Sequence, residues 1–564
     1  MDKFNGAEAA VRMLDLYGVR HIFGLCGDTS LPFYDALYKM EHRITHVLTR
    51  DERSATYMAD GYARVSGKPG VCEGPSGGGA TYLLPGLVEA NESSSPVLGI
   101  TSDVPVLSRG RYPLTELDQK ALYRPLTKWN TVCDHADQVP QAIRSAFRHM
   151  TTGRPGAAHI GLPFDVLKQP VDLAEIWVQE DHARCPAWRC SAEPGAVDAA
   201  AVSILAARRP VLVCGGGVIT AGATEVLLEI ATLLDAPVCT TVSGKGSIAE
   251  THPLSAGVVG SNGGVIATRE VVQQADLVIF VGCRAGSTTT EHWTRPSRDV
   301  AIVHIDVDPT AVSANYKTTH ALIGDARLVL EALHERLRRR ESDHVQGHFD
   351  GKAVAARARR SKFDAFNRLA AEDVRPIRPE RVLAELHRVL PRDAIVVADP
   401  GTPCPYVAAY YPMEAAGRHF ITNRAHGALG YSMSAAMGAW FAQPDRKCVS
   451  VMGDGSFGFS VGELETVVRY KVPLLMVVLS NATYGWIKAS QRASYGQRYF
   501  SVDFSRTDHA RIAADYGVRS WRVDDPEQLG PVLRQAAEHG GPALVDVIAQ
   551  SLEDAAAPVL QWMG

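Results

Sequence analysis

Two polar side chains in the C-terminal third of the chain each follow an apolar run, and their types suit a metal ion. Asp454 lies between Gly453 and Gly455, and Asn481 closes the run of residues 472–480. The glycines let the backbone come close to a ligand, and the start of the helix predicted after them favours an anion. A carboxylate repels a diphosphate unless a cation lies between them, and Mg²⁺ binds carboxylate, amide and phosphate oxygens together.

These residues predict a magnesium and diphosphate site at one edge of a parallel sheet. Ligands of open parallel sheets bind beyond the carboxyl ends of the strands, where Asp454 and Asn481 would meet one ion. The backbone carbonyl of Thr483 would complete the protein's share of the ligands. The alternative is an ordinary Gly-Asp-Gly turn and an unrelated asparagine, which the pairing of two strand ends disfavours.

Three blocks along the 564 residues contain the elements that would position this site. In each block short apolar runs alternate with helical patterns, which predicts a parallel sheet. The strands predicted in the first block are residues 21–27, 45–50, 70–75 and 95–102. We therefore expect an α/β fold of three consecutive doubly wound parallel-sheet domains. Their expected bounds are 1–175, 195–340 and 375–564, and the charged, helix-prone tract 336–372 is interpreted as a connector.

Composition and charge exclude several classes of protein. With 58 Lys and Arg against 62 Asp and Glu, the chain has no basic footprint for nucleic acid or for a membrane surface. No apolar run is long enough to span a bilayer, and the first residues contain no apolar signal region. The ten cysteines are scattered and fit reduced thiols. We expect a cytoplasmic protein with no nucleic-acid or membrane partner.

The segment from Gly453 through Asn481 resembles the cofactor motif of thiamine-diphosphate-dependent enzymes. The three blocks resemble, over essentially the whole chain, the group of acetolactate synthase, benzoylformate decarboxylase and pyruvate oxidase. The resemblance implies thiamine diphosphate and Mg²⁺ as cofactors, with Asp454, Asn481 and the Thr483 carbonyl as metal ligands. The residues that it implies for the diphosphate are Gly401, Thr402, Gly453, Gly455, Ser456, Tyr484 and Gly485. The chain departs from the group at Ser480, where an asparagine is usual.

Glu52 follows a predicted strand and begins a predicted helix. By its spacing alone it would be a surface acid favoured by the helix dipole. Residues 50–72 closely resemble the acetolactate synthase segment whose glutamate hydrogen-bonds the cofactor's pyrimidine ring, which implies that role for Glu52. A partly buried carboxyl with a raised pKa can exchange a proton with that ring and so help to remove the weakly acidic C2 proton. Because Glu52 and Asp454 fall in different domains, the resemblance implies a site shared by two subunits of a homodimer or homotetramer.

The stretch of residues 423–439 also resembles this group. The alignment implies that Gly427 offers its carbonyl to the cofactor's amino group and that Leu429 is the apolar wedge that bends the cofactor. The alternative is a glycine turn and a core leucine. His426 is the one histidine inside a cofactor motif, which makes it a candidate for proton handling, with a structural role as the alternative.

Asp28 is the candidate acid on the substrate side. It stands where pyruvate and indolepyruvate decarboxylases carry an aspartate, and an acid there could assist the release of an aldehyde. The alternative is an Asx turn. Other decarboxylase features are missing, because Pro75 stands where benzoylformate decarboxylase has a histidine.

The reaction is predicted from these resemblances together. Leu114, Thr115 and Glu116 replace the Phe-Gln-Glu of acetolactate synthases, and Ser490 replaces their substrate-selecting tryptophan. We expect decarboxylation of a 2-oxo acid followed by ligation of the carbanion to a second carbonyl. The alternatives are a simple decarboxylase that releases an aldehyde and, less favoured, a flavin-linked 2-oxo acid oxidase. Residues 214–217 and Arg284 echo an FAD-binding pattern, and the resemblance leaves FAD binding open.

Overall fold

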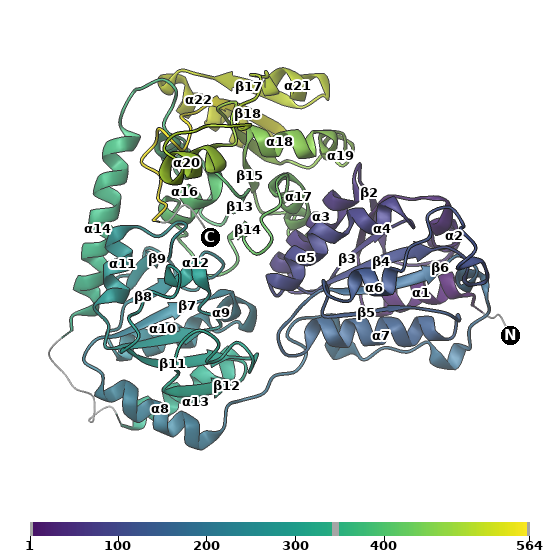
Figure 1. The fold of residues 1–564 in the computed structure, drawn as a ribbon, viewed down its shortest axis with the longest axis horizontal. Coiled ribbons are helices and arrows are strands. Elements are labelled where there is room, and N and C mark those ends of the chain that lie inside the picture. Colours follow the sequence, from purple (N-terminus) through teal and green to yellow (C-terminus); the bar gives the residue numbers. More distant parts are fainter. Residues whose placement is uncertain (1–3, 341–348, 561–564) are drawn as a thin grey trace. The chain divides into compact units, whose positions relative to one another are not determined.

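The computed structural model describes residues 4–340 and 349–560. Each of the three blocks forms a six-stranded parallel sheet with helices packed on it, which confirms the predicted α/β class (Figure 1). Contacts divide the chain into two compact units. One consists of residues 1–188, 423–448 and 459–474, and the other of residues 189–422, 449–458 and 475–564.

The first sheet has the strand order β2-β1-β3-β4-β6-β5. Its strands are β1 (His21–Gly24), β2 (Thr45–Leu48), β3 (Gly70–Gly74), β4 (Val97–Asp103), β5 (Trp129–Val132) and β6 (Ala158–Pro163). The four predicted strands are confirmed within a few residues at their ends. Two further strands were not predicted. β5 is a half-buried edge strand, and β6 contains a glycine and a proline that weaken the strand pattern.

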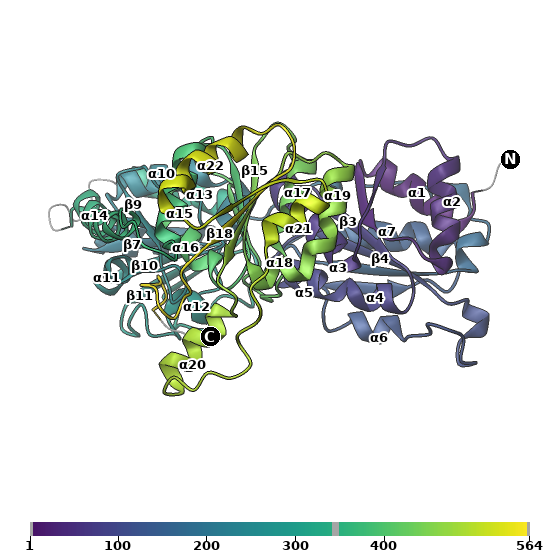
Figure 2. The ribbon, with the colours of Figure 1, turned by 90° about the horizontal axis from the view of Figure 1, so that it is seen from above.

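Helices cover both faces of the first sheet (Figure 2). Three of them build the large apolar cluster on one face: α1 (Gly6–Leu16), α2 (Leu31–Lys39) and α7 (Gln138–Thr151). The shorter helices α4 (Gly78–Tyr82), α5 (Leu84–Glu92) and α6 (Gln119–Tyr123) follow β3 and β4. The helix α3 (Glu52–Ser66) packs against β3 and also against α17 (Ser432–Ala442), which comes from the far end of the chain.

The helices α3 and α17 approach each other at two glycines. A Cβ atom on Gly61 would lie 2.1 Å from the carbonyl oxygen of Ala435, and one on Gly438 would lie 1.9 Å from that of Met58. Any side chain at either position would therefore overlap the partner backbone. This contact fixes the segment of residues 423–448 on the N-terminal domain within one compact unit.

The middle sheet has the different order β12-β11-β10-β7-β8-β9. Its strands are β7 (Pro210–Cys214), β8 (Val238–Thr240), β9 (Ser255–Val258), β10 (Leu277–Val281), β11 (Ala301–Asp306) and β12 (His320–Ile323). Since the order reverses between β7 and β10, this sheet has the strand arrangement of dinucleotide-binding folds. Helices α8 (Pro194–Ala206), α10 (Thr224–Leu233), α11 (Ile266–Gln273) and α13 (Ala326–Arg339) pack around it.

The tract predicted as a connector is largely helical where the structure describes it. Residues 336–339 end α13, and α14 (Gly351–Ala370) packs against α11 and β9, with Val354, Ala355 and Ala358 inside an apolar cluster of the middle domain. The high charge of this tract lies on the exposed face of an amphipathic helix, whose apolar face packs on the middle domain. Residues 341–348 of the predicted connector lie outside the described residues.

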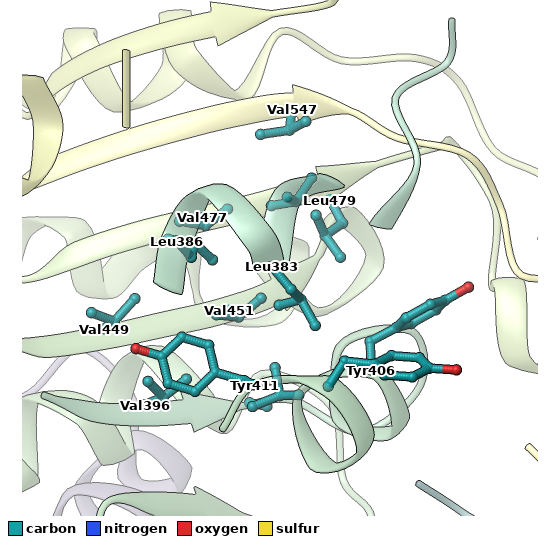
Figure 3. Packing of buried hydrophobic residues seen from close by; sticks show 14 of the residues in the cluster. Leu383, Leu386, Val396, Tyr406, Tyr411, Val449, Val451, Val477, Leu479 and Val547 are labelled. Atoms are coloured by element: carbon teal, nitrogen blue, oxygen red, sulfur yellow. The ribbon is translucent and has the colours of Figure 1, made fainter. Parts of the chain in front are cut away.

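The third sheet repeats the order of the first, as β14-β13-β15-β16-β18-β17. Its strands are β13 (Ile395–Ala398), β14 (Phe420–Thr422), β15 (Cys448–Gly453), β16 (Leu475–Ser480), β17 (Arg519–Val523) and β18 (Ala543–Ile548). Figure 3 shows Val449, Val451 and Val477 of the strands beside Leu383 and Leu386 of α15 (Pro379–Val389). These buried side chains hold the strands in place and so fix the edge of the sheet where the predicted metal ligands lie.

Candidate cofactor site

Asp454 joins the ends of the two neighbouring strands β15 and β16. Its Oδ2 accepts hydrogen bonds from the amides of Asn481, at 2.9 Å, and Ala482, at 2.6 Å, while Oδ1 accepts from the amide of Gly455 at 2.9 Å. Burial raises the pKa of the carboxyl, and the amide donors oppose that increase. The strand ends therefore come together as predicted, on a buried carboxylate with defined orientation.

The ordinary Gly-Asp-Gly turn of the alternative interpretation does not form. β15 runs to Gly453, and α18 (Asp454–Ser460) begins at the next residue without an intervening turn. Gly455 lies close to the Tyr484 ring, because a Cβ there would lie 2.9 Å from Cε1 of that ring. The ring of Tyr484 therefore lies directly over the first turn of α18.

The residues beside Asp454 offer further oxygen donors. The side-chain oxygen of Asn481 accepts the amide of Thr483 at 3.3 Å, and the carbonyl of Thr483 accepts the amide of Gly485 at 2.9 Å. Each of these oxygens keeps a lone pair, and carboxylate, amide and carbonyl oxygens are the ligands that Mg²⁺ takes. Within the described ranges no group of three His, Cys, Asp or Glu side chains could hold a metal. The donor set here fits a hard cation that shares its ligands with phosphate, not a transition metal.

The other residues predicted for the diphosphate lie in the same compact unit. Gly401, with φ of +87°, and buried Thr402 follow β13 and precede α16 (Pro403–Tyr410). A Cβ on Gly485 would lie 3.3 Å from Oγ1 of Thr402, so the start of α20 (Gly485–Ser494) is packed beside that hydroxyl. Ser456 is buried in the first turn of α18.

Glu52 is the first residue of α3, in the other compact unit, and its side chain is 7% exposed. Two glycines make room for it, since a Cβ on Gly79 would lie 3.1 Å from its Oε1 and one on Gly74 would lie 3.3 Å from its Cγ. Burial raises the pKa of the carboxyl, and the charges of Asp51 and Glu73 add to the increase. The surface acid considered as the alternative is therefore wrong, because Glu52 is buried.

The loop after β14 holds the second group of predicted residues in the same unit as Glu52. Gly427 has φ of +76°, and Leu429 is half-buried beside it. His426 is exposed, and its backbone amide donates to Oε2 of Glu89 at 2.7 Å. The structure thus brings Gly427 and Leu429 together in a loop that is anchored through the backbone of His426.

Asp28 is exposed and begins a short 3-10 helix. The amide of Ser30 donates to the carbonyl of Gly27, so the Asx turn considered for Asp28 is not formed. Next to it a chain of hydroxyls crosses the edge of the sheet, from Ser102 through Thr29 at 2.8 Å, then Ser76 at 3.0 Å, to Thr115 at 2.7 Å. Hydroxyl groups from four separate segments therefore meet beside Asp28.

Family descriptions of thiamine pyrophosphate (diphosphate) enzymes match three parts of the chain in order. The N-terminal TPP binding domain matches residues 4–122, the central domain matches residues 197–333, and the C-terminal TPP binding domain matches residues 399–547. The chain belongs to the thiamine pyrophosphate enzyme family.

Relatives that match the chain over nearly its whole length show which thiamine pyrophosphate enzymes it is similar to. The probable acetolactate synthase large subunit of Methanococcus aeolicus is 33% identical over 553 residues, covering 96% of this chain and 91% of that protein. The probable large subunit of Methanocaldococcus jannaschii is 34% identical over 557 residues, covering 97% and 92%. Acetolactate synthase isozyme 3 large subunit of Escherichia coli is 32% identical over 544 residues, covering 95% and 93%. The resemblance to the acetolactate synthase group is confirmed.

This thiamine pyrophosphate enzyme also contains several buried acids that were not among the predicted site residues. Glu73, at the end of β3, accepts a short hydrogen bond from the Tyr34 hydroxyl, which also lies 2.9 Å from Nε2 of His46. Glu89 and Glu463 accept backbone amides of loops that carry predicted site residues. An acidic residue inside an otherwise apolar run, as at Glu73, was the available signal. Glu89 and Glu463 lie on stretches with a helical pattern, where an acid at one position is ordinary.

The described part of the chain also bears on membranes. Among residues 4–340 and 349–560, none of the helices combines the length and the apolar character that a membrane span needs.

Proposed function

We propose that the protein decarboxylates a 2-oxo acid and ligates the resulting fragment to a second carbonyl, as an acetolactate-synthase-like carboligase. The observation that carries the proposal is the buried Glu52 carboxyl with its raised pKa at the start of α3. The names of the relatives, which match the chain over at least nine-tenths of its length, support the choice of reaction. When bound, thiamine diphosphate supplies the nucleophilic carbon and the electron sink that this decarboxylation requires.

Asp454, the side-chain oxygen of Asn481 and the carbonyl of Thr483 would hold Mg²⁺. The orientation of Asp454 by three backbone amides supports this role, because a preorganised carboxylate loses little freedom on binding a cation. The backbone and hydroxyl groups proposed to bind the diphosphate belong to Gly401, Thr402, Gly453, Gly455, Ser456, Tyr484 and Gly485.

Glu52 would hold or release a proton at the pyrimidine ring nitrogen. A carboxyl whose pKa is raised by burial exchanges a proton near neutral pH more readily than an exposed one. The carbonyl of Gly427 would accept the cofactor's amino group, and Leu429 would support the bent conformation. The positive φ of Gly427 supports this role, because the residue aims its carbonyl in a way that a larger residue rarely adopts.

On the substrate side, Asp28 and His426 are proposed to manage protons. Both side chains are exposed, so they are accessible to a substrate or to water. The hydroxyls of Thr29, Ser76 and Thr115 would orient a carbonyl acceptor, which favours ligation. Release of an aldehyde assisted by the Asp28 carboxylate is the second candidate, because that carboxylate stands free of an Asx turn.

We propose a homodimer as the minimum assembly and a homotetramer as the working form, in the cytoplasm. The middle domain has the strand order of dinucleotide-binding folds, which keeps FAD as a candidate ligand. The glycines at 215 and 217 have a structural reason of their own, since a Cβ on either would overlap Gly282. The proposed ligation needs no electron acceptor, whereas reduction of a bound flavin on adding pyruvate would indicate an oxidase.

A panel of 2-oxo acids tests the reaction. The protein is reconstituted with thiamine diphosphate and Mg²⁺, and each acid is supplied with and without a second oxo acid or an aldehyde. We expect CO₂ release together with a carbon-carbon product. Aldehyde as the main product under all conditions would favour the second candidate, and no turnover of any acid would contradict both.

A further inference from the structure

The two loops that would contact the pyrimidine end of the cofactor occupy equivalent places in two sheets of the same strand order. One loop follows β2 and carries Arg50 to Glu52, and the other follows β14 and carries His426 to Leu429. Both belong to one compact unit, in which α3 and α17, the helices that follow these loops, pack against each other. Each loop is tied down by a carboxylate from the other domain.

The first carboxylate is Glu89 of α5, which is fully buried. Its Oε2 accepts the backbone amide of His426, the residue before Gly427, at 2.7 Å. Its Oε1 accepts Arg64 at 3.1 Å and the hydroxyl of Ser93. The carboxylate is thus held from one side by a cation and holds the loop on the other.

Arg64 is itself part of a buried polar network. It pairs with Asp60 at 2.8 Å, and Asp60 accepts the hydroxyl of Tyr431 at 2.5 Å. Tyr431 lies two residues after Leu429, so the network grips the loop of residues 426–429 from both ends. Burial raises the pKa of Glu89, and the charge of Arg64 opposes that increase.

The second carboxylate is Glu463, between α18 and α19 (Leu464–Arg469) of the third domain. It is 1% exposed, and its Oε1 accepts the backbone amide of Arg50, two residues before Glu52, at 2.9 Å. Its Oε2 accepts the hydroxyl of Thr466 at 2.6 Å. Both of these donors are neutral, whereas Glu89 faces a guanidinium.

We infer that Glu89 and Glu463 are reciprocal positioning residues, each of which fixes the cofactor loop of the opposite domain. The inference rests on the proposed function, because it assigns these loops to the cofactor's pyrimidine ring. Each glutamate follows the third strand of its own sheet, β3 or β15, and each holds the loop after the edge strand of the other sheet. Hydrogen bonds from a backbone amide to a buried carboxylate are short and strong, so each one restrains the backbone of its loop.

A glutamine could keep the hydrogen bonds of the native glutamate at position 463 but not at position 89. At Glu463 the amide oxygen of glutamine can accept the Arg50 amide while its NH₂ group faces the hydroxyl of Thr466, which can turn to accept. At Glu89 the NH₂ group of glutamine would face either Arg64 or the amide of His426, and both are donors. Glu463→Gln should therefore be mild, and Glu89→Gln should be severe.

The test follows the exchange of the C2 proton of bound thiamine diphosphate with deuterium, in full-length protein reconstituted with thiamine diphosphate and Mg²⁺. Glu89→Gln and Glu463→Ala should slow exchange by about tenfold or more, because small misplacements of reacting groups carry costs of that order. Glu463→Gln should stay within about threefold of the parent. Tyr431→Phe removes one hydroxyl of the network and should slow exchange by about threefold, which tests the same point if Glu89→Gln does not fold.

The matched control is Glu385→Gln on α15. Glu385 is a buried carboxylate paired with Arg381 at 2.9 Å and Arg388 at 2.7 Å, and it touches no cofactor loop. We expect it to lower the melting temperature without changing exchange. If Glu89→Gln, Glu463→Ala and Tyr431→Phe behave like this control, the positioning role is wrong.

Failure of the proposed function has a different signature. Glu52→Gln should slow exchange strongly in the same assay. A parent protein that does not bind thiamine diphosphate, or a Glu52→Gln variant that exchanges as fast as the parent, would overturn the proposed function and the positioning role with it. If Glu52→Gln slows exchange as expected but the Glu89 and Glu463 variants exchange as fast as the parent, the positioning role alone is overturned.

Discussion

The first and third sheets have the same strand order but carry different polar side chains at the carboxyl ends of their strands. After the third strand of the first sheet, β3, come Pro75 and Ser76, while after its counterpart β15 comes Asp454. The first edge presents hydroxyls and the buried carboxyl of Glu52, and the third presents a carboxylate bound by three amides. In the proposed function, the same framework would handle protons in one domain and hold a cation with phosphate in the other.

The middle sheet has a different order and a different use of charge. Lys245, which is 1% exposed, pairs with Glu250 at 2.5 Å and donates to the carbonyl of Ala408 at 3.1 Å. Glu250 also accepts the amide of Met413, so this ion pair ties the middle domain to the third within one unit. The buried charges of the middle domain therefore join two domains. In the first and third domains, buried carboxylates instead hold the loops that carry predicted site residues.

The largest expected effect comes from removing the carboxylate of the third sheet. Asp454→Ala should weaken Mg²⁺-dependent binding of thiamine diphosphate by at least about a hundredfold. Even the loss of a residue that only hydrogen-bonds a metal ligand lowers metal affinity by about ten- to a hundredfold. It would also leave the amides of Asn481 and Ala482 without their acceptor. Binding is measured by titrating the cofactor into the stripped protein at fixed Mg²⁺.

Asp103→Ala is the matched variant for the first sheet. Asp103 ends β4, the counterpart of β16, and is buried with the Val104 amide and Arg109 as partners. Its loss should lower stability and leave the Mg²⁺ dependence of binding unchanged. An equal loss of binding in both variants would contradict the assignment of the cation to the third sheet.

Local patterns were enough to predict the fold class and the strand ends that carry Asp454, Asn481 and Glu52. Apolar runs fix the strands, and a parallel sheet brings their carboxyl ends to one edge whatever the helices do. The edge strand β5 was missed because its residues are half-buried and alternate weakly. The direct passage from β15 into α18 was missed because two glycines around an acid favour a turn in isolation.

Contacts between distant segments could not be predicted in the same way. Glu89 and His426 are separated by most of the chain, and nothing in either local pattern indicates that one accepts the amide of the other. The same holds for Gly61 and Gly438, which read as ordinary helix residues until α3 and α17 are seen to meet. Such pairs depend on the packing of whole domains, which a single sequence does not reveal.

A medium effect is expected at the crossing of the two equivalent helices, α3 and α17. Gly438→Ala should destabilise the protein by about 1–3 kcal/mol, since the new methyl group would meet the carbonyl of Met58. A helix-interior glycine replaced by alanine normally gains up to about 1 kcal/mol, so the sign itself tests the contact. The measurement is the denaturation midpoint of the protein in urea.

Gly540→Ala serves as the control for that change. No atom lies within 4 Å of the position that its Cβ would take, so the substitution should be close to neutral. A Gly438→Ala variant as stable as the control would mean that the two helices do not approach as closely as described.

The smallest expected effect distinguishes the Glu52 carboxyl of the first sheet from the amide-bound Asp454 carboxylate of the third. The pKa of Glu52 is raised above its ordinary value near 4.5, so between these two values the folded protein keeps a proton that the unfolded chain has released. The free energy of unfolding therefore falls as the pH rises through this window, and the loss persists above it. Glu52→Gln removes that loss, so the cofactor-free variant should melt a few degrees above the parent at about pH 7 and near the parent at about pH 4.

Asp454→Asn should instead melt at a lower temperature than the parent at both pH values, because its NH₂ group would oppose backbone amides that now donate to the carboxylate. Thermal melts of the three proteins across this range measure the difference, and a Glu52→Gln variant that is less stable at about pH 7 would show that the Glu52 carboxylate has a stabilising partner.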